Sequence, residues 1–327
     1  MWRELNPAET ESLKPRFDTA HVAYYLGALL VIGAMGWFTT REWDHLGGPG
    51  LTAVGALYAA CFTLAGWRLW SRADLRIPAG LLLTVAVCMV PLTAFGIERW
   101  TGLWPAADPG SYSRFHPYID GSWVIMELAA IAAGISALRT WRFPFLTAPV
   151  AYALWYMSMD LPALILRRQP FAWEEKEQIT TAFGAAMLFA AYVMDLRGRS
   201  DDFSFWGYLF GLAAFWGGLT SLDSNSEWSK LVYCLINLGL IGCSLVLQRR
   251  GFLVFGALGF FGYLGHLAYR VFEDSLLFPF ALSGIGLAVI LLGVYYQRRR
   301  TGIESRLRAA LLPSIGRFLP PRLTAKN

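Results

Sequence analysis

The sequence predicts an all-α membrane protein, a polytopic bundle of about ten transmembrane helices with both termini in the cytoplasm. Three observations support this fold class. Hydrophobic residues make up 56% of the 327 residues, only 16% are charged, and the mean hydropathy is +0.43, which is more apolar than a soluble domain. The apolar residues fall into runs of roughly the 20 residues that a helix needs to cross a bilayer. No run alternates as the strands of a barrel do.

These runs predict an order of elements along the chain. Asn6, Pro7 and Glu9 have the spacing of a cap and first turn of a short helix. The acidic segment 1–19 lacks the basic start of a signal peptide, so we interpret it as cytoplasmic and the first run as an uncleaved span. The ten spans that we expect are 20–39, 50–70, 77–97, 121–138, 143–166, 178–196, 203–220, 229–247, 252–271 and 276–296.

One transmembrane domain over residues 20–296 is therefore expected, followed by a basic cytoplasmic tail over 297–327. In the tail, residues 302–312 place apolar side chains at helical spacing beside arginines, which predicts an amphipathic helix on the anionic inner leaflet. The outer loop 98–120 is rich in proline and aromatic residues. It is either a lid over a binding surface or a loop that re-enters or lies along the membrane, and we favour the second interpretation.

The distribution of the 28 Lys and Arg residues gives the orientation. With the N-terminus inside, every even-numbered span ends in a basic cluster: WRLWSR, LRTWR, DLRGR, LQRR and YYQRRR. Fewer basic residues fall on the outer side: Arg41, Arg99, Arg114, Arg167, Arg168, Lys176, Lys230 and Arg270. Because cytoplasmic segments are enriched in Lys and Arg, this distribution favours ten spans with both termini inside.

An internal repeat is a further hypothesis. YYLGALLVIGAMG (24–36) aligns without gaps with LVFGALGFFGYLG (253–265). Glycines recur at a constant offset, with Gly27, Gly33, Gly36 and Gly55 matching Gly256, Gly262, Gly265 and Gly284. Two interpretations stay open: a parallel repeat of helical hairpins around a site, or Gly-rich spans that match by chance, since small residues are common at helix interfaces in membranes.

Several kinds of chemistry are not expected. All four cysteines lie inside apolar runs without CxxC or metal-ligand spacing: Cys61, Cys88, Cys234 and Cys243. His116 and Asp120 stand at i, i+4 in the outer loop but lack a third ligand, so we expect neither a metal nor another cofactor. The absence of a phosphate-binding loop, an HExxH or a GxSxG motif argues against an enzyme. The aromatic–basic stretches belong to the membrane interface, so we expect no nucleic acid.

The candidate functional residues are polar side chains inside the predicted spans. Two carboxylates, an imidazole and a guanidinium share the outer half of the membrane, with an amide somewhat deeper: Glu127, Asp160, His266, Arg270 and Asn237. Such ionisable groups seldom face lipid, which costs about 2.5–3.5 kcal/mol, so we expect them to face the bundle interior. Pro162 cannot donate to the carbonyl of Ser158, which opens polar backbone beside Asp160.

Three interpretations of these side chains stay open. In the first, Asp160 pairs with Arg270, or Glu127 with His266, and the pairs fix helix packing. In the second, each group reaches the outer headgroups alone. In the third, the groups form a proton- or cation-coupled site in which a carboxylate exchanges protons with His266.

The stretches HVAYYLGALLVIGAMGWF, LWYMSMDLPA and FLVFGALGFFGYLGHLAYRVFEDSLLFPFAL resemble uncharacterised multi-span membrane proteins of bacteria that are grouped as domains of unknown function. The resemblance covers most of the chain and implies a bacterial inner membrane, without a known chemistry. Ten spans with both ends inside is also similar to drug/metabolite-type exporters. Those are built from inverted five-span halves, whereas the repeat considered for this chain is parallel.

The function that we expect is transport of a small solute or ion across the inner membrane through Glu127, Asp160 and His266, because intramembrane charges mark pathways. The alternative is a non-catalytic scaffold or accessory subunit of a membrane complex. An intramembrane enzyme acting on lipid-linked substrates ranks third because polar residues are few. The expected partners are the bilayer, with anionic lipid at the basic C-terminal tail, and a membrane-protein partner or a second copy of the chain.

Overall fold

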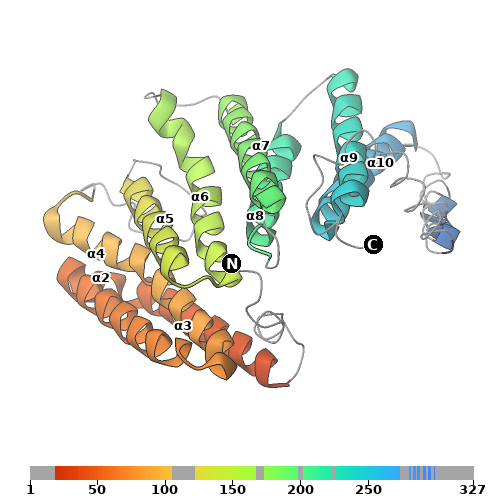
Figure 1. The fold of residues 1–327 in the computed structure, drawn as a ribbon. Helices are drawn as coiled ribbons and strands as arrows, with labels where there is room; N and C mark the ends of the chain where they lie inside the picture. Colours follow the sequence, from red (N-terminus) through yellow and green to blue (C-terminus); the bar gives the residue numbers. More distant parts are fainter. Residues whose placement is uncertain are drawn as a thin grey trace. The chain divides into compact units, whose positions relative to one another are not determined.

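The computed structural model describes residues 19–104, 122–166, 173–197, 202–222 and 226–272, with a few scattered helical positions between 280 and 298. Within these ranges the chain is helical and has no strand (Figure 1). Among the described residues, five helices are long and apolar enough to cross a membrane: Leu46–Trp70, Ala73–Thr101, Trp123–Thr140, Glu175–Arg197 and Trp228–Leu247. The predicted all-α membrane class is thereby confirmed, whereas the count of ten spans, the side of the termini and the repeat stay predictions.

Two compact units make up the chain, Met1–Phe215 and Trp216–Asn327. Several predicted features lie outside the described residues: the segment before residue 19, most of the outer loop with His116 and Asp120, and the tail with its amphipathic helix. Of Arg270, only the helical backbone is described.

Helix α2 (Thr19–Trp70) consists of two helical segments that turn at Gly47, where φ is 60° and ψ is 179°. Side chains of both segments, among them Val31 and Phe62, line one cavity. A straight helix would hold these two residues roughly 47 Å apart at 1.5 Å per residue. The chain therefore folds back at Gly47, whose backbone conformation is one that glycine adopts without strain. The turn lies between the predicted spans 20–39 and 50–70.

The third predicted span is a broken helix, made of α3 (Arg76–Cys88) and α4 (Val90–Thr101). The break falls at Met89, two residues before Pro91. Proline has no amide hydrogen to continue the helical ladder, which accounts for the interruption. The short 3-10 helix η1 (Ala73–Leu75) joins α3 to the end of α2.

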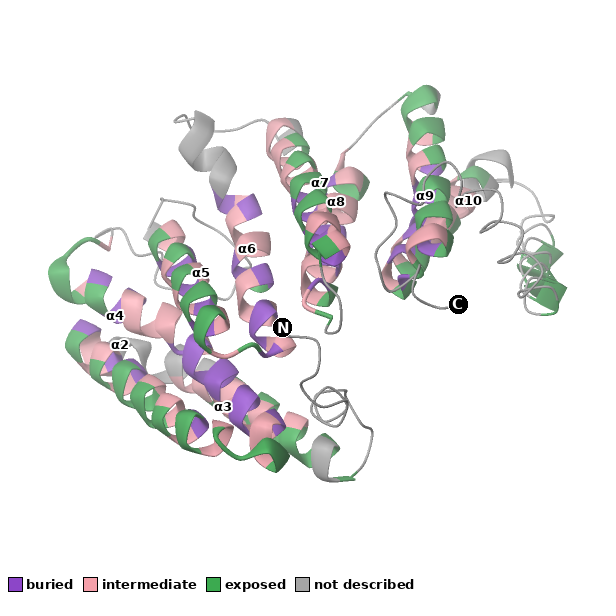
Figure 2. Cartoon of the chain, in the orientation of Figure 1, coloured by how far each residue is buried: buried purple, intermediate pink, exposed green. Residues whose placement is uncertain are grey.

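Helix α3 forms the buried centre of the first unit. In the most apolar 18-residue stretch of Ala73–Thr101, 56% of the residues are buried, whereas the corresponding figure for Leu46–Trp70 is 17%. Figure 2 shows buried residues concentrated along α3. The apolar core joins α3 to α5 (Ser122–Thr140) and to the 3-10 helix η2 (Pro144–Leu146). Its buried members are Ile77, Leu81, Leu83, Val87, Ala137, Phe143 and Leu146.

The first unit continues with α6 (Thr147–Leu166), α7 (Trp173–Arg197) and the larger part of α8 (Phe205–Ser221). Helix α6 packs against α5 on one side and α7 on the other. Gly184 of α7 lies directly on the backbone of Phe215 in α8, where a Cβ atom would have no room.

The second unit is built on a helical hairpin of α9 (Glu227–Leu247) and α10 (Arg250–Phe272). The chain turns at Gln248, which has a φ of 52° and caps α9 in the left-handed conformation. The hairpin packs closely because Gly256 and Gly259 of α10 lie against Asn237 and Ile241 of α9. Small residues that let two backbones approach are a common basis of helix association in membranes.

Candidate functional site

Glu127 and Asp160 lie on consecutive helices of the first unit. Glu127 is in the second turn of α5 and Asp160 is near the end of α6, and the two helices pack side by side. The two helices lie close together because the side chain of Val150 in α6 packs directly on Gly134 of α5, which has no side chain of its own. Both carboxylates are buried, with exposed fractions of 6% for Glu127 and 0% for Asp160.

The two carboxyl groups lie within hydrogen-bonding reach of each other, and each senses the charge of the other. Neither carboxylate oxygen of Glu127 has a hydrogen-bond donor among the described residues. Two carboxylates cannot donate to each other unless one of them is protonated. The arrangement can therefore hold a proton between Glu127 and Asp160, as paired carboxyl groups do in proteins that share one proton between two acids.

The backbone beside Asp160 is satisfied from α7. Because Pro162 cannot donate to the carbonyl of Ser158, that carbonyl is available, and Thr180 Oγ1 donates to it at 3.1 Å. The hydroxyl of Ser158 itself donates to the carbonyl of Trp155 at 2.6 Å. The polar backbone that the sequence predicts at this point is thus present, and it joins α6 to α7 two residues before Asp160.

Replacing Thr180 with valine should lower the stability of the first unit by about 1 kcal/mol or more, because a buried carbonyl is left without its donor. Thermal unfolding of the detergent-solubilised protein measures the effect. Thr181→Val is the matched control, since Thr181 Oγ1 donates at 2.7 Å to the carbonyl of Glu177 in its own helix. Equal melting temperatures for the two variants would show that the contact from Thr180 to Ser158 adds no stability.

A further buried carboxylate, Glu98 in the last turn of α4, is not among the predicted site residues. It is 2% exposed, and neither of its carboxylate oxygens has a donor within the described part of the chain. Glu98 is the first residue of the predicted outer loop 98–120. Phe95 is buried against Trp104, with ring centroids 4.6 Å apart. Glu98 follows Phe95 by three residues, and this spacing indicates that both side chains lie on the same inward face of the helix.

Asn237 and His266 belong to the second unit. Asn237 is fully buried, and its Nδ2 donates at 2.8 Å to the carbonyl of Tyr233. Its Oδ1 faces Gly259, whose missing side chain provides the space. His266 follows Gly259 by two helical turns, about 10 Å along the helix axis. The Nε2 atom of His266 and the Oδ1 atom of Asn237 are both buried without a hydrogen-bond partner among the described residues.

Four of the five predicted site residues therefore fall into two pairs, one in each unit. Glu127 and Asp160 contact each other in the first unit, Asn237 and His266 lie on neighbouring helices of the second, and the side chain of Arg270 is outside the described part. A single site containing all five, and the pairs Asp160–Arg270 and Glu127–His266, stay predictions.

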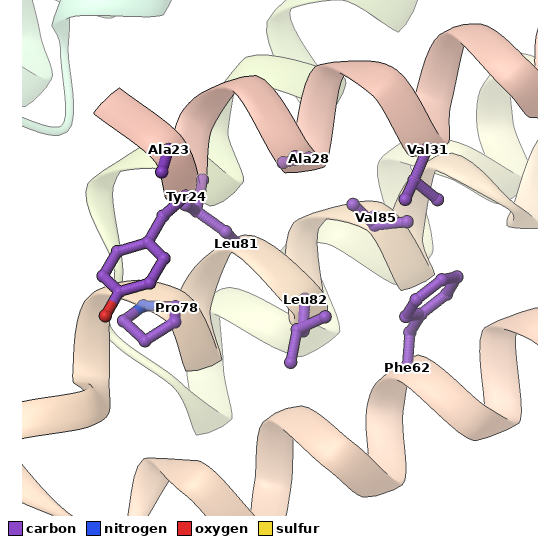
Figure 3. A pocket seen from close by; sticks show the side chains of 10 residues that line it. Ala23, Tyr24, Ala28, Val31, Phe62, Pro78, Leu81, Leu82 and Val85 are labelled. Carbon is purple, nitrogen blue, oxygen red and sulfur yellow. The ribbon is translucent and has the colours of Figure 1, made fainter. Parts of the chain in front are cut away.

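The structure also contains an apolar cavity of about 320 Å³ between α2 and α3. Figure 3 shows the residues that line it. Neither Glu127 nor Asp160 is among them, so this cavity and the carboxyl pair are separate features of the first unit. No group of three or more His, Cys, Asp or Glu side chains that could hold a metal ion occurs within the described ranges.

No protein-family model matches the chain, and neither the curated proteins nor the solved structures give a match. The class of this protein is accordingly defined by its own features. It is a membrane protein of apolar helices with a carboxyl pair enclosed between two of them.

Proposed function

We propose that the protein is an inner-membrane transporter of a small solute or ion, in which the Glu127–Asp160 pair takes up and releases a proton during the cycle. The observation that carries the proposal is the contact between two buried carboxyl groups on adjacent apolar helices. Ionisable side chains inside membrane spans mark ion pathways and proton relays by default. The proposal includes ten spans with both termini in the cytoplasm, which the basic clusters after every even-numbered span support.

The chemistry of the pair follows from its charge. With one proton the pair carries a single negative charge and an internal hydrogen bond, and with a second proton it becomes neutral. A cation or a solute with a positive group can replace the proton at the singly charged pair. The described elements around α5 and α6 carry further titratable groups: Arg76 and Cys88 on α3, Glu98 and Arg99 on α4, Arg139 on α5 itself, Tyr152 and Tyr156 on α6 itself, and Glu175, Lys176, Glu177, Tyr192, Asp195 and Arg197 on α7.

Helix α6 has a feature that suits such a cycle. Pro162 removes one bond of the helical ladder, and the side chain of Thr180 replaces that bond. Helices bend most readily where the ladder is interrupted by proline. A bend at this point would move Asp160 relative to Glu127 and change the distance over which they share a proton.

Proton movement into liposomes tests the proposal. The purified protein is reconstituted with a pH-sensitive dye inside, and an inward proton movement is driven by a potassium diffusion potential. We expect a rate above that of empty liposomes, reduced to that background by Asp160→Asn and by Glu127→Gln. Glu98→Gln, which changes a buried carboxylate outside the pair, should retain the rate of the unmodified protein. If Asp160→Asn and Glu127→Gln keep the proton-movement rate of the unmodified protein, the carboxyl pair does not take up and release the transported proton.

The alternative function is a non-catalytic scaffold or accessory subunit of a membrane complex. The burial of the pair favours it, because the side chain of Asp160 is fully buried and the apolar cavity between α2 and α3 is lined by other residues. In a scaffold the shared hydrogen bond would fix the α5–α6 contact. A rate for the unmodified protein no higher than that of empty liposomes would favour this alternative.

A further inference from the structure

The cavity between α2 and α3 has an apolar wall. Its volume is about 320 Å³, and its lining includes Tyr24, Gly27, Val31, Phe62, Pro78 and Leu82. No lining side chain is charged. Figure 3 shows Tyr24 and Pro78 at one end, and Val31 and Phe62 toward the other. The cavity is therefore an apolar space with its one phenol group at the Pro78 end.

Small residues on α2 leave this space open. Ala23, Gly27 and Ala28 lie along the α2 side of the cavity, and a Cβ atom added at Gly27 would meet no atom within 4 Å. Apolar cavities exclude water because they offer it no hydrogen-bond partners, and they bind apolar ligands instead. In a membrane protein, a space of this kind is accessible to hydrocarbon.

Arginines gather at the Pro78 end of the cavity. Arg68 is in the last turn of α2, Arg72 precedes η1, and Arg76 begins α3 two residues before Pro78. Arg68 and Arg72 are exposed, Arg76 is half-buried, and the exposed Asp74 is the one acidic residue among them. Basic clusters next to membrane helices bind the headgroups of anionic lipids.

We propose that this cavity holds one acyl chain of an anionic phospholipid whose phosphate lies against Arg68, Arg72 and Arg76. A cationic end next to an apolar space matches an amphiphile with a negative headgroup. A partner helix does not fit, because a helix about 10 Å across would fill 320 Å³ in less than one turn. A neutral lipid would fill the apolar space but would make no use of the arginines.

Native mass spectrometry tests the site. The protein is extracted from nanodiscs that contain equal amounts of phosphatidylglycerol and phosphatidylcholine, and the lipids that remain bound are counted. We expect one phosphatidylglycerol to be retained in preference to phosphatidylcholine. Gly27→Leu and, independently, Ala28→Leu should remove it by filling the cavity. Gly33→Leu is the matched control, because Gly33 lies on the same helix in open space and does not line the cavity.

A second pair of variants tests the headgroup. Arg72→Gln combined with Arg76→Gln should abolish the preference for phosphatidylglycerol, whereas Arg197→Gln at the end of α7 should preserve it. Melting temperatures are measured for every variant, so that unfolding is not read as lipid loss. The proposal is overturned if the unmodified protein retains no lipid or retains both lipids equally. It is also overturned if the folded Gly27→Leu and Ala28→Leu variants retain phosphatidylglycerol as Gly33→Leu does.

Discussion

The Gly96→Leu variant should lose a large part of its thermal stability. In the structure, Gly96 of α4 lies on the backbone of α2, where an added Cβ would approach the carbonyl oxygen of Gly48 to 3.0 Å and the amide nitrogen of Thr52 to 2.5 Å. Backbone atoms cannot change rotamer to make room as a flexible side chain does, so leucine would push the two helices apart. Overpacking a tight contact costs about 1–3 kcal/mol, occasionally more, and we expect a loss of about 3 kcal/mol.

The matched control for this change is Gly217→Leu on α8. Nothing lies within 4 Å of a Cβ added at Gly217, so the same substitution should alter the melting temperature little. If Gly96→Leu and Gly217→Leu have the same melting temperature, α2 and α4 do not meet at Gly48 and Gly96.

A double-mutant cycle on the carboxyl pair should show strong coupling between Glu127 and Asp160. Asp160→Leu alone leaves Glu127 buried without its partner, which we expect to lower the stability by about 2–3 kcal/mol. Adding Glu127→Leu removes the second polar group, so the double variant should be no less stable than either single variant. Chemical or thermal unfolding in detergent gives the four free energies, and the coupling energy should exceed about 1 kcal/mol.

The isosteric variants provide the comparison for this cycle. Asp160→Asn keeps a group that donates to a carboxylate, so it should cost less than about 1 kcal/mol while it removes proton exchange. Additive losses in the two leucine variants would instead indicate that the side chains act independently. In that case the pair could neither fix the α5–α6 contact nor share a proton.

Composition and charge were sufficient to predict the membrane class, because apolar runs of span length have few other interpretations. Local irregularities were harder to predict. The turn at Gly47 falls within GGPG, where glycine and proline are expected breakers, but the break at Met89 depends on how Pro91 is accommodated in a buried helix. The division of the chain after Phe215 has no local signal in the sequence, since it reflects which helices pack together.

For the site, the sequence indicated the depth of the polar side chains but not which of them meet. Glu127 and Asp160 lie on consecutive antiparallel helices at similar distances from one end, so the prediction that they share one level of the membrane follows from counting residues. Glu127 contacts Asp160, a pairing that the sequence did not suggest, and the pairings with Arg270 and His266 stay predictions. Which side chains meet depends on helix rotation, which residue counting does not determine. Thr180 was missed for the same reason, because its bond to Ser158 crosses between helices.

The most direct test of the account is infrared spectroscopy of the purified protein in lipid, with proton uptake and release driven by a change in pH. The central claim is that Glu127 and Asp160 share a proton. It predicts a carbonyl stretching band of a protonated carboxylic acid that disappears in Asp160→Asn and in Glu127→Gln and persists in Glu98→Gln. The same band in all three variants, or no such band in the unmodified protein, would contradict the claim.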